Sequence, residues 1–190
     1  MFARTQRLLL RPGWQEDSQA LAQAIGNEPV IRNLSRAPWP YGEQDAEEYL
    51  TRSRDPLLPD FLIFSRTLGA PRLIGGCGIS RGEEGGLELG YWIARPYWGL
   101  GFATEASRAV MRIARATGLS GVTASHFLDN PASGNVLRKI GFRPTGQIAS
   151  RYSIGRGADV ACALFEQGEE VDMPRNLHLD LYSDARSLAA

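Results

Sequence analysis

The sequence predicts an α/β domain in which an antiparallel meander is followed by a βαβ unit. Three strand-like runs, at 61–66, 72–81 and 87–93, are separated by turns rich in glycine and indicate the meander. A strand, a glycine turn, an alanine-rich helix and a further strand between residues 87 and 128 indicate the βαβ unit. With 190 residues, 43% of them hydrophobic, the chain is long enough to bury one shared core.

The first 60 residues are expected to contribute one strand and two helices. Residues 7–12 (RLLLRP) form the predicted strand. A helix is predicted after Asp17 and Ser18, which offer N-cap oxygens, and a second short helix is predicted around 46–50. Between the helices, the segment 33–42 (NLSRAPWPYG) contains two prolines and a glycine that interrupt regular structure. We expect this segment to form a wall of a substrate site.

The second half of the chain is predicted to alternate helices with strands. The apolar spacing from Ala106 to Ala114 indicates a long helix that ends at Gly118. Its solvated side is expected to carry three arginines: Arg108, Arg112 and Arg115. The elements predicted after it are a strand (122–128), a helix (131–140) and two strands (142–148 and 159–166). Arg151 and Arg156 fall in the predicted loop between the last two strands, where we expect solvated charges.

Residues 1–168 are predicted to form a single domain, and residues 169–190 a C-terminal tail that packs loosely or is disordered. Lysine plus arginine and aspartate plus glutamate both number 21, so no net charge draws the chain to nucleic acid or to an anionic membrane. No apolar run approaches the roughly 18 residues that a membrane span needs, and a signal-peptide pattern is missing from the first residues. The cytoplasm is therefore the expected location.

The cysteines and histidines indicate neither a disulfide framework nor a metal site. Cys77 and Cys162 lie in strand-like apolar runs, which favours buried thiols in a reducing compartment. The two histidines, His126 and His178, have no cysteine or histidine at ligand spacing, so we expect no bound metal.

The glycine turn at 98–104 (WGLGFAT) carries the strongest indication of a ligand. The first N–H groups of a helix have no intrahelical acceptor and lie at the positive end of its dipole, so they suit a phosphate or pyrophosphate. A tight turn without a ligand is the alternative. A Walker loop is excluded because no lysine follows the glycines, and a dinucleotide fingerprint lacks its third glycine, since Thr104 stands there. A dinucleotide-binding oxidoreductase stays a distant alternative.

Three segments resemble the GNAT N-acetyltransferase superfamily in their order and spacing. The turn resembles its Q/R-x-x-G-x-G/A loop for the CoA pyrophosphate, with Trp98 in place of Gln or Arg. The stretches TQRLLLRP, LELGYWIARPYWGLGFATEA and DNPASGNVLRKIGF resemble the branch that includes the ribosomal-protein N-terminal acetyltransferases, and the likeness extends over residues 4–166. The resemblance implies the GNAT fold, a mixed and mostly antiparallel sheet that splays at the cofactor cleft with helices on both faces, and acetyl-CoA as the acetyl donor.

The resemblance also implies which residues hold the donor. Pantetheine would pair with the strand edge around Trp92 and Ile93, where a backbone amide can polarise the thioester carbonyl. Asn130 matches the family asparagine near the pantetheine arm, a role compatible with starting a helix. Asn135 is a candidate to support the cofactor, with a solvated helix position as the alternative. The backbone amides that would bind the pyrophosphate belong to Gly99, Leu100, Gly101, Phe102, Ala103 and Thr104.

Acetyl transfer to an amine needs a base for the amine and usually a proton for the thiolate. Strand alternation places Glu88 and Trp92 on one face, so Glu88 can act as the base, directly or through water, if that face lines the cleft. The alternative is a strand glutamate that faces solvent. Leu137 occupies the position of the tyrosine acid found in many family members. Ser133 stands where the ribosomal-type branch has a serine proposed to protonate the thiolate, and a helix-capping role is equally open.

The acceptor implied by the resemblance is a primary amine, either a protein N-terminus or a small molecule, attacked without a covalent enzyme intermediate. His126 is a candidate to face it, with a packing or surface role as the alternative. Trp39 and Tyr41 are candidates for an apolar lip, or for packing between the two early helices. A monomer and a homodimer are both open. A catalytically silent acyl-CoA-binding regulatory module on the same fold is the second functional hypothesis, because Leu137 replaces the tyrosine.

Overall fold

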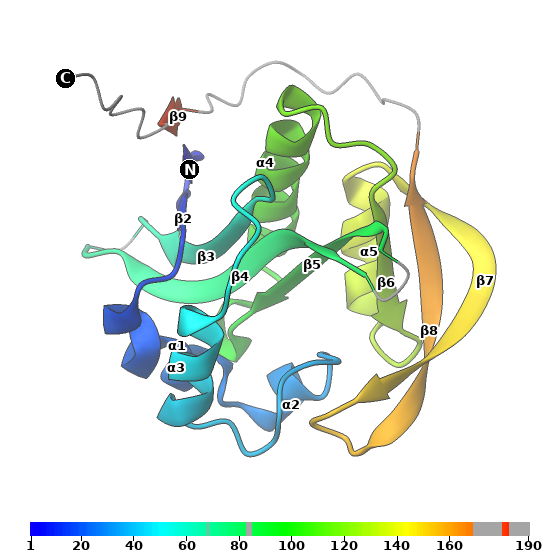
Figure 1. The fold of residues 1–190 in the computed structure, drawn as a ribbon, viewed down its shortest axis with the longest axis horizontal. Helices are drawn as coiled ribbons and strands as arrows, with labels where there is room; N and C mark the ends of the chain where they lie inside the picture. Colours follow the sequence, from blue (N-terminus) through cyan, green and yellow to red (C-terminus); the bar gives the residue numbers. More distant parts are fainter. Residues whose placement is uncertain (68, 83–84, 169–179, 183–190) are drawn as a thin grey trace.

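The computed structural model describes residues 1–67, 69–82, 85–168 and 180–182. The strands are β1 (Phe2–Arg4), β2 (Leu8–Arg11), β3 (Asp60–Ser65), β4 (Arg72–Arg81), β5 (Leu87–Ile93), β6 (Thr123–Phe127), β7 (Phe142–Ser153), β8 (Ala158–Gln167) and β9 (Asp180–Tyr182). They form a single sheet in the order β7-β8-β6-β5-β4-β3-β2-β1-β9 (Figure 1). Every neighbouring pair is antiparallel except β5 and β6, which are parallel.

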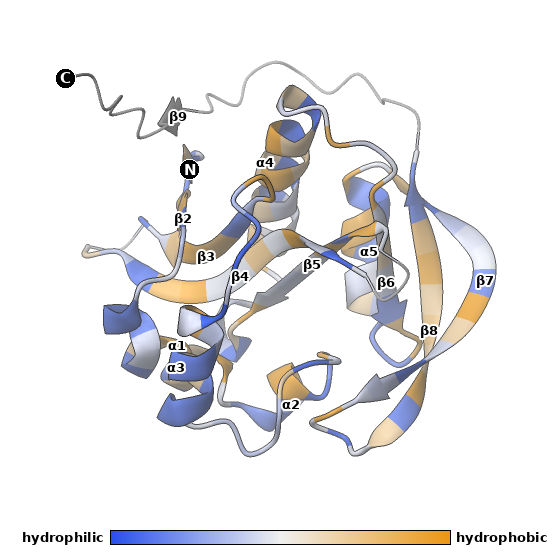
Figure 2. Ribbon diagram, in the orientation of Figure 1, coloured by the Kyte–Doolittle hydropathy of each residue, from blue (hydrophilic) through white to orange (hydrophobic). Residues whose placement is uncertain are grey.

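Helices cover both faces of the sheet, as Figure 1 shows. They are α1 (Ser18–Ile25), α2 (Glu28–Ile31), α3 (Glu43–Thr51), α4 (Phe102–Ala116) and α5 (Pro131–Lys139), with short 3-10 turns η1 (Gln15–Asp17) and η2 (Arg95–Tyr97). Val110 of α4 and Leu137 of α5 are fully buried in the core on one face, whereas Leu21 of α1 and Leu50 of α3 belong to the core on the other. In Figure 2 much of the α3 ribbon is blue, which marks its hydrophilic residues. The predicted fold class is confirmed.

The parallel pair at the centre of the sheet is paired over only a short length. Glu88 lies opposite Thr123 and Leu89 opposite Ala124, and the described residues show no further pairing between β5 and β6. Beyond Leu89 the two strands separate, while β5 stays paired with β4 as far as Ile93. This separation leaves one edge of β5 without a strand partner next to the N-terminal end of α4.

The structure differs from the sequence prediction at several elements. The last hairpin is longer than predicted, because β7 continues beyond residue 148 to Ser153 after a register shift between Pro144 and Ile148. Arg151 therefore lies within a strand and not in a loop, so that prediction is wrong. Strand β1 and the four-residue helix α2 were not predicted, since neither has enough residues to establish a periodicity.

Three smaller predictions concern helix α4, the tail and the cysteines. Arg115 is exposed as predicted, but Arg108 is half-buried and donates to the Lys139 carbonyl over 3.0 Å, because α5 packs beside α4. In the predicted tail, residues 169–179 and 183–190 lie outside the described residues, and β9 pairs with β1. Both cysteines are buried and unbridged, as predicted. No helix within the described ranges combines the length and apolar character needed to cross a bilayer.

Candidate functional site

A cavity of about 540 Å³ opens where β5 and β6 separate. It is bounded by β5, the turn that leads into α4, the C-terminal part of β6 and the first turns of α5. Residues 33–36, from the predicted loop-rich wall, close another side. Segments that are far apart in sequence therefore meet at the point where the sheet splays.

The glycine turn forms part of the wall of this cavity. Gly99 and Gly101 have φ angles of 76° and 81°, a region that favours glycine. Gly101 is the N-cap of α4 and brings no side chain to satisfy the first N–H groups of the helix. The turn residues that line the cavity are Trp98, Gly99, Gly101, Phe102, Ala103 and Thr104. Leu100 lies outside the lining, and its carbonyl accepts a hydrogen bond from Arg7.

Trp98, the residue that departs from the family motif, joins this turn to β5. Its Nε1 donates to the Ile93 carbonyl over 2.6 Å. The Ala94 N–H donates to Ile74 of β4, and backbone groups alternate in direction along a strand, so those of Ile93 and Tyr91 face the open edge. Trp92 lines the cavity with its neighbours, but by the same alternation its backbone groups face β4. The unpaired groups at this edge are therefore those of Tyr91 and the Ile93 N–H.

Ser133 of α5 contacts a tyrosine that sequence reasoning did not single out. The hydroxyl of Tyr91 lies 2.8 Å from Ser133 Oγ and 3.0 Å from the Ser133 carbonyl. Burial raises the pKa of Tyr91, so the phenol stays protonated near neutral pH. Strand alternation places Tyr91 on the face opposite Glu88 and Trp92. The side chains of Tyr91 and Ser133 meet on that face, where α5 packs against the neighbouring strand β6.

Asn130 and Asn135 lie at the two ends of the first turn of α5. Asn130 is the N-cap of the helix, and its Oδ1 accepts from the Ser133 N–H over 3.4 Å. It also lines the cavity, so the capping and the ligand-facing positions are compatible. Asn135 lines the cavity as well, but it is exposed and its Oδ1 accepts from Arg138. Leu137 is fully buried and does not line the cavity.

Glu88 faces the cavity as part of a polar group with side chains from two other strands. Its Oε1 accepts from Ser125 Oγ over 2.9 Å and from Arg151 Nη1 over 2.6 Å. The Glu88 side chain is only 13% exposed. The alternative of a glutamate facing solvent is therefore wrong, and so is the expectation that Arg151 is merely solvated. In the described part of the chain, Glu88 Oε2 accepts no hydrogen bond.

His126 lines the cavity, but its ring is fixed by packing. Its Nδ1 lies 2.8 Å from the carbonyl of Phe127, and its ring centroid lies 5.4 Å from that of Phe165. A Cβ on Gly134 would lie 2.6 Å from His126 Nε2, so glycine is needed there for α5 to sit against the histidine. Both alternatives considered for His126, packing and facing a ligand, are compatible with this position.

A second cavity of about 590 Å³ lies beside the first and shares part of β5 with it, including Gly90, Tyr91 and Trp92. Tyr41 lines this second cavity, and burial raises the pKa of its phenol. Trp39 is 44% exposed and lies outside the lining of both cavities. The structure thus brings Tyr41, but not Trp39, to a cavity that adjoins the splayed strands.

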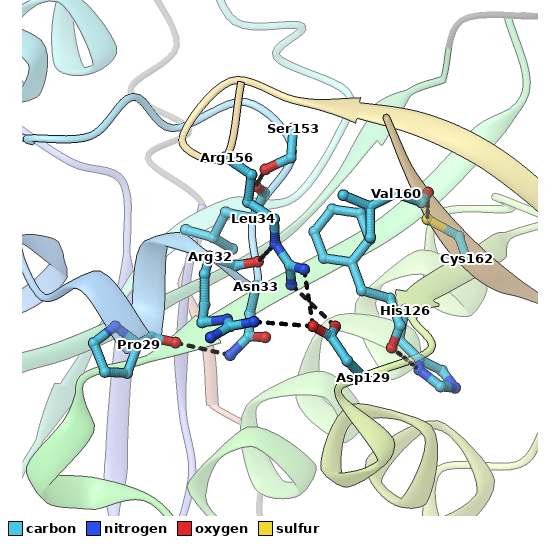
Figure 3. Close-up of polar contacts among 11 residues, drawn as sticks. Pro29, Arg32, Asn33, Leu34, His126, Asp129, Ser153, Arg156, Val160 and Cys162 are labelled. Atoms are coloured by element: carbon cyan, nitrogen blue, oxygen red, sulfur yellow. Dashed lines mark hydrogen bonds and ion pairs between the residues drawn. The ribbon is translucent and has the colours of Figure 1, made fainter. Parts of the chain in front are cut away.

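Ion pairs fasten the wall of the two cavities to the last hairpin, as Figure 3 shows. Arg156 binds Asp129 through two hydrogen bonds of 2.8 and 3.0 Å and donates to the Arg32 carbonyl over 2.6 Å. Arg32 also binds Asp129, over 3.1 Å. The hydrogen bonds from Arg156, together with the one from Arg32, hold the pKa of Asp129 below its ordinary value. We call the set Arg32, Asp129 and Arg156 the clasp. The prediction that Arg156 is merely solvated is wrong.

Comparison with known proteins assigns this arrangement to a class of enzymes, the acetyltransferases. A model of the acetyltransferase (GNAT) domain matches residues 7–143, so the chain belongs to the GNAT acetyltransferase family. A Bacillus subtilis protein named "Uncharacterized N-acetyltransferase YoaA" is 29% identical, over 75% of this chain and 82% of its own.

Solved structures share the fold at low sequence identity. The ribosomal-protein-S5-alanine acetyltransferase of Vibrio fischeri gives a TM-score of 0.72 at 17% identity, over 92% of this chain and 100% of its own. The microcin C7 self-immunity acetyltransferase MccE, solved with acetyl-CoA and AMP, gives a TM-score of 0.69 at 16% identity, over 86% of this chain and 93% of its own. At such identities the likeness shows the fold alone.

Proposed function

We propose that this GNAT protein transfers the acetyl group of acetyl-CoA to a primary amine by direct attack of the amine on the thioester. The observation that carries the proposal is the uncapped N-terminus of α4, with two glycines at positive φ, beside the unpaired edge of β5. The first feature suits a pyrophosphate and the second suits the amides of a pantetheine arm. The complex of MccE with acetyl-CoA, a protein of the same fold, supports this choice of donor.

In this proposal the turn 99–104 holds the pyrophosphate, and pantetheine pairs with the open edge of β5 up to Ile93. The N–H of Tyr91 faces this edge and is the donor that would polarise the thioester carbonyl. Asn130 and Asn135 line the path of the arm along α5. Lys139, which also lines the cavity, would add a positive charge for a donor that carries phosphates.

In this mechanism Glu88 accepts the proton of the amine, and Ser133 stabilises the thiolate that leaves. Glu88 Oε2, free of hydrogen bonds from the described residues, accepts the proton of the amine directly or through one water, while Arg151 and Ser125 fix the carboxylate through Oε1. Ser133 Oγ donates a hydrogen bond to the departing thiolate and accepts one from the protonated Tyr91 hydroxyl, 2.8 Å away. Neither cysteine competes as a nucleophile, because burial raises the pKa of Cys77 to about 12 and Cys162 is also buried.

The amine acceptor is proposed to approach through the second cavity, on the side of β5 away from α4, with Tyr41 in its wall. A protein N-terminus is the first acceptor to test, because the structural neighbours include an acetyltransferase for ribosomal protein S5 alanine. A small-molecule amine is the second. The two buried, unbridged cysteines fit the cytoplasm as the site of the reaction.

A catalytically silent acyl-CoA-binding module is the competing proposal. It is favoured by the buried Leu137, which carries no acid, and by the ion pair that engages Glu88. If this proposal is right, the protein binds CoA but acetylates no amine, and replacement of Glu88 or Ser133 changes no activity. Release of CoA thiol with a panel of peptides and small amines distinguishes it from the transferase.

The first experiment is a thermal-shift titration with acetyl-CoA, CoA and NAD. A ligand at 100 times its Kd stabilises the native state by about 2.7 kcal/mol, which gives a clear rise in Tm. We expect a rise with both CoA compounds and none with NAD, and loss of the rise in Gly101→Asp. Gly118→Asp is the matched control, because Gly118 has a φ of 77° at the opposite end of α4, outside the cavity lining. A rise with NAD alone, or with no ligand, contradicts the proposal.

A further inference from the structure

Arg7 links the turn between β1 and β2 to the glycine turn. Its Nη1 donates to the carbonyl of Leu100 over 2.9 Å, and its Nε donates to Glu105 Oε2 over 2.7 Å. The guanidinium also lies over the ring of Phe102, 4.5 Å from the centroid. A Cβ on Gly101 would lie 3.5 Å from Nη2. The Arg7 side chain thus bonds to Leu100 and Glu105, lies over the ring of Phe102 and comes close to Gly101.

Glu105 is an unfavourable neighbour for an anion at the N-terminus of α4. It is 9% exposed and belongs to the first turn of the helix, whose residues Phe102, Ala103 and Thr104 line the cavity. Its carboxylate is held by Thr5 Oγ1 over 2.6 Å, by the Arg7 N–H over 3.0 Å and by the Arg7 side chain. Of these partners, only the Arg7 guanidinium brings a positive charge. Without that charge, the carboxylate would oppose binding of a phosphate group to the same turn.

The bond to Leu100 adds a geometric effect. Arg7 holds the Leu100 carbonyl on the side of the turn away from the cavity, since neither Leu100 nor Arg7 belongs to the lining. A carbonyl that rotated into the cavity would present a negative dipole where N–H groups are needed. The hydrogen bond from Arg7 opposes this rotation, and Gly99 and Gly101 on either side of Leu100 are the residues that would otherwise permit it.

We propose that Arg7 is a positioning residue for the pyrophosphate of CoA. It keeps the turn 98–104 in the conformation that presents its N–H groups, and it cancels the charge of Glu105 at the positive end of α4. Arg7 acts through Leu100 and Glu105 and does not touch the ligand. This inference rests on the proposed binding of CoA and assigns part of the CoA affinity to a residue more than 90 positions away in sequence from the turn.

The test is the Kd for CoA of Arg7→Met, measured by calorimetry below the melting transition of every variant. Hydrogen bonds from charged groups predict a loss of about 10- to 100-fold. Arg7→Lys keeps the charge but not the forked geometry and is expected to lie between wild type and Arg7→Met. Arg4→Met is the matched control, since Arg4 is exposed on the same N-terminal hairpin and does not line either cavity. It is expected to bind CoA like wild type.

A double variant separates positioning from general stabilisation. In Arg7→Met with Glu105→Gln, the unbalanced carboxylate is absent, so we expect part of the lost CoA affinity to return even though the bond to Leu100 is missing. Equal Kd values for Arg7→Met and Arg4→Met overturn the inference, and so does a double variant as weak as Arg7→Met. Failure of the wild-type protein to bind CoA is a separate result and overturns the proposed function instead.

Discussion

The two regions beside the splayed strands, the proposed donor side and the proposed acceptor side, are built in different ways. On the donor side, the turn 98–104 and the open edge of β5 offer backbone groups, fixed by glycine conformations and by the start of a helix. On the acceptor side, the wall at 33–41 is held by side chains from distant segments, through the clasp and through a hydrogen bond from Ser153 to the Leu34 carbonyl. The proposed donor side thus depends on backbone groups, whereas the shape of the proposed acceptor side depends on contacts between side chains.

Because of this difference, the two regions should respond differently to substitutions of their side chains. Backbone N–H groups can bind a pyrophosphate whatever side chains surround them, so the proposed donor side can keep its ligand while its side chains change. An acceptor wall held by ion pairs can change its shape with a few substitutions and leave the sheet intact. Substitutions on the two sides should therefore affect different kinetic constants.

The largest expected effect is on turnover and comes from Glu88→Gln. Loss of a general base lowers kcat by roughly 100-fold, whereas the Kd for CoA should stay within a few-fold of wild type. Ser125→Ala is the control, because it removes one hydrogen bond to Oε1 and keeps the carboxylate and Arg151. The measurement is steady-state CoA release with a saturating amine. An equal loss of CoA affinity in Glu88→Gln would show that the two sides are not separable.

The next effect is on CoA affinity and comes from Gly99, where Asp and Asn can be compared. Both residues tolerate positive φ better than most and have the same shape, and a Cβ on Gly99 meets no atom within 4 Å. Two negative charges about 8 Å apart near a surface repel by about 2 kcal/mol, so Gly99→Asp should bind CoA roughly 30-fold more weakly than Gly99→Asn. Titration calorimetry measures both. Equal Kd values would mean that no phosphate group binds at this turn.

The same contrast explains what the sequence could predict. The donor side was predicted from one continuous segment, because glycines and a helix start leave a local pattern. The meander and the βαβ unit were likewise predicted from runs of neighbouring residues. The pairing of Glu88 with Arg151, the contact of Tyr91 with Ser133 and the clasp join residues at least 27 positions apart. The hydrophobic periodicity of a sequence indicates which face of a strand is buried, but not which side chains of distant strands meet. These contacts were therefore not predicted.

The longer strand β7 shows how one missed element hides a site residue. Gly146, with a φ of 79°, lies within the register shift between Pro144 and Ile148, so the strand bends there and then continues. The sequence prediction carries the strand through this point but ends it at residue 148 and places a loop after it. With that loop assigned, Arg151 lost its strand position and with it the prediction that it faces Glu88.

The smallest expected effect comes from the clasp and concerns both stability and the acceptor. Asp129→Asn removes ion pairs between partly exposed groups, which contribute about 1 kcal/mol or less. The pKa of Asp129 is lowered in the folded protein, chiefly by hydrogen bonds from Arg156, so the stabilisation is fully present above the ordinary value of 3.8 and is lost as the pH falls through the lower folded value. The Tm difference from wild type should therefore be constant near neutral pH and should shrink below pH 3.8.

The clasp variant also tests whether the wall serves the acceptor alone. We expect the KM for the amine to rise a few-fold in Asp129→Asn, with the Kd for CoA unchanged, because the clasp holds Arg32, next to the wall residues 33–36, and does not contact the glycine turn. Asp159→Asn is the matched control, since it removes the same charge from an exposed position of the hairpin that carries Arg156. A higher Kd for CoA with an unchanged KM for the amine would reverse the assignment, because the wall would then belong to the donor side and the acceptor would have to enter elsewhere.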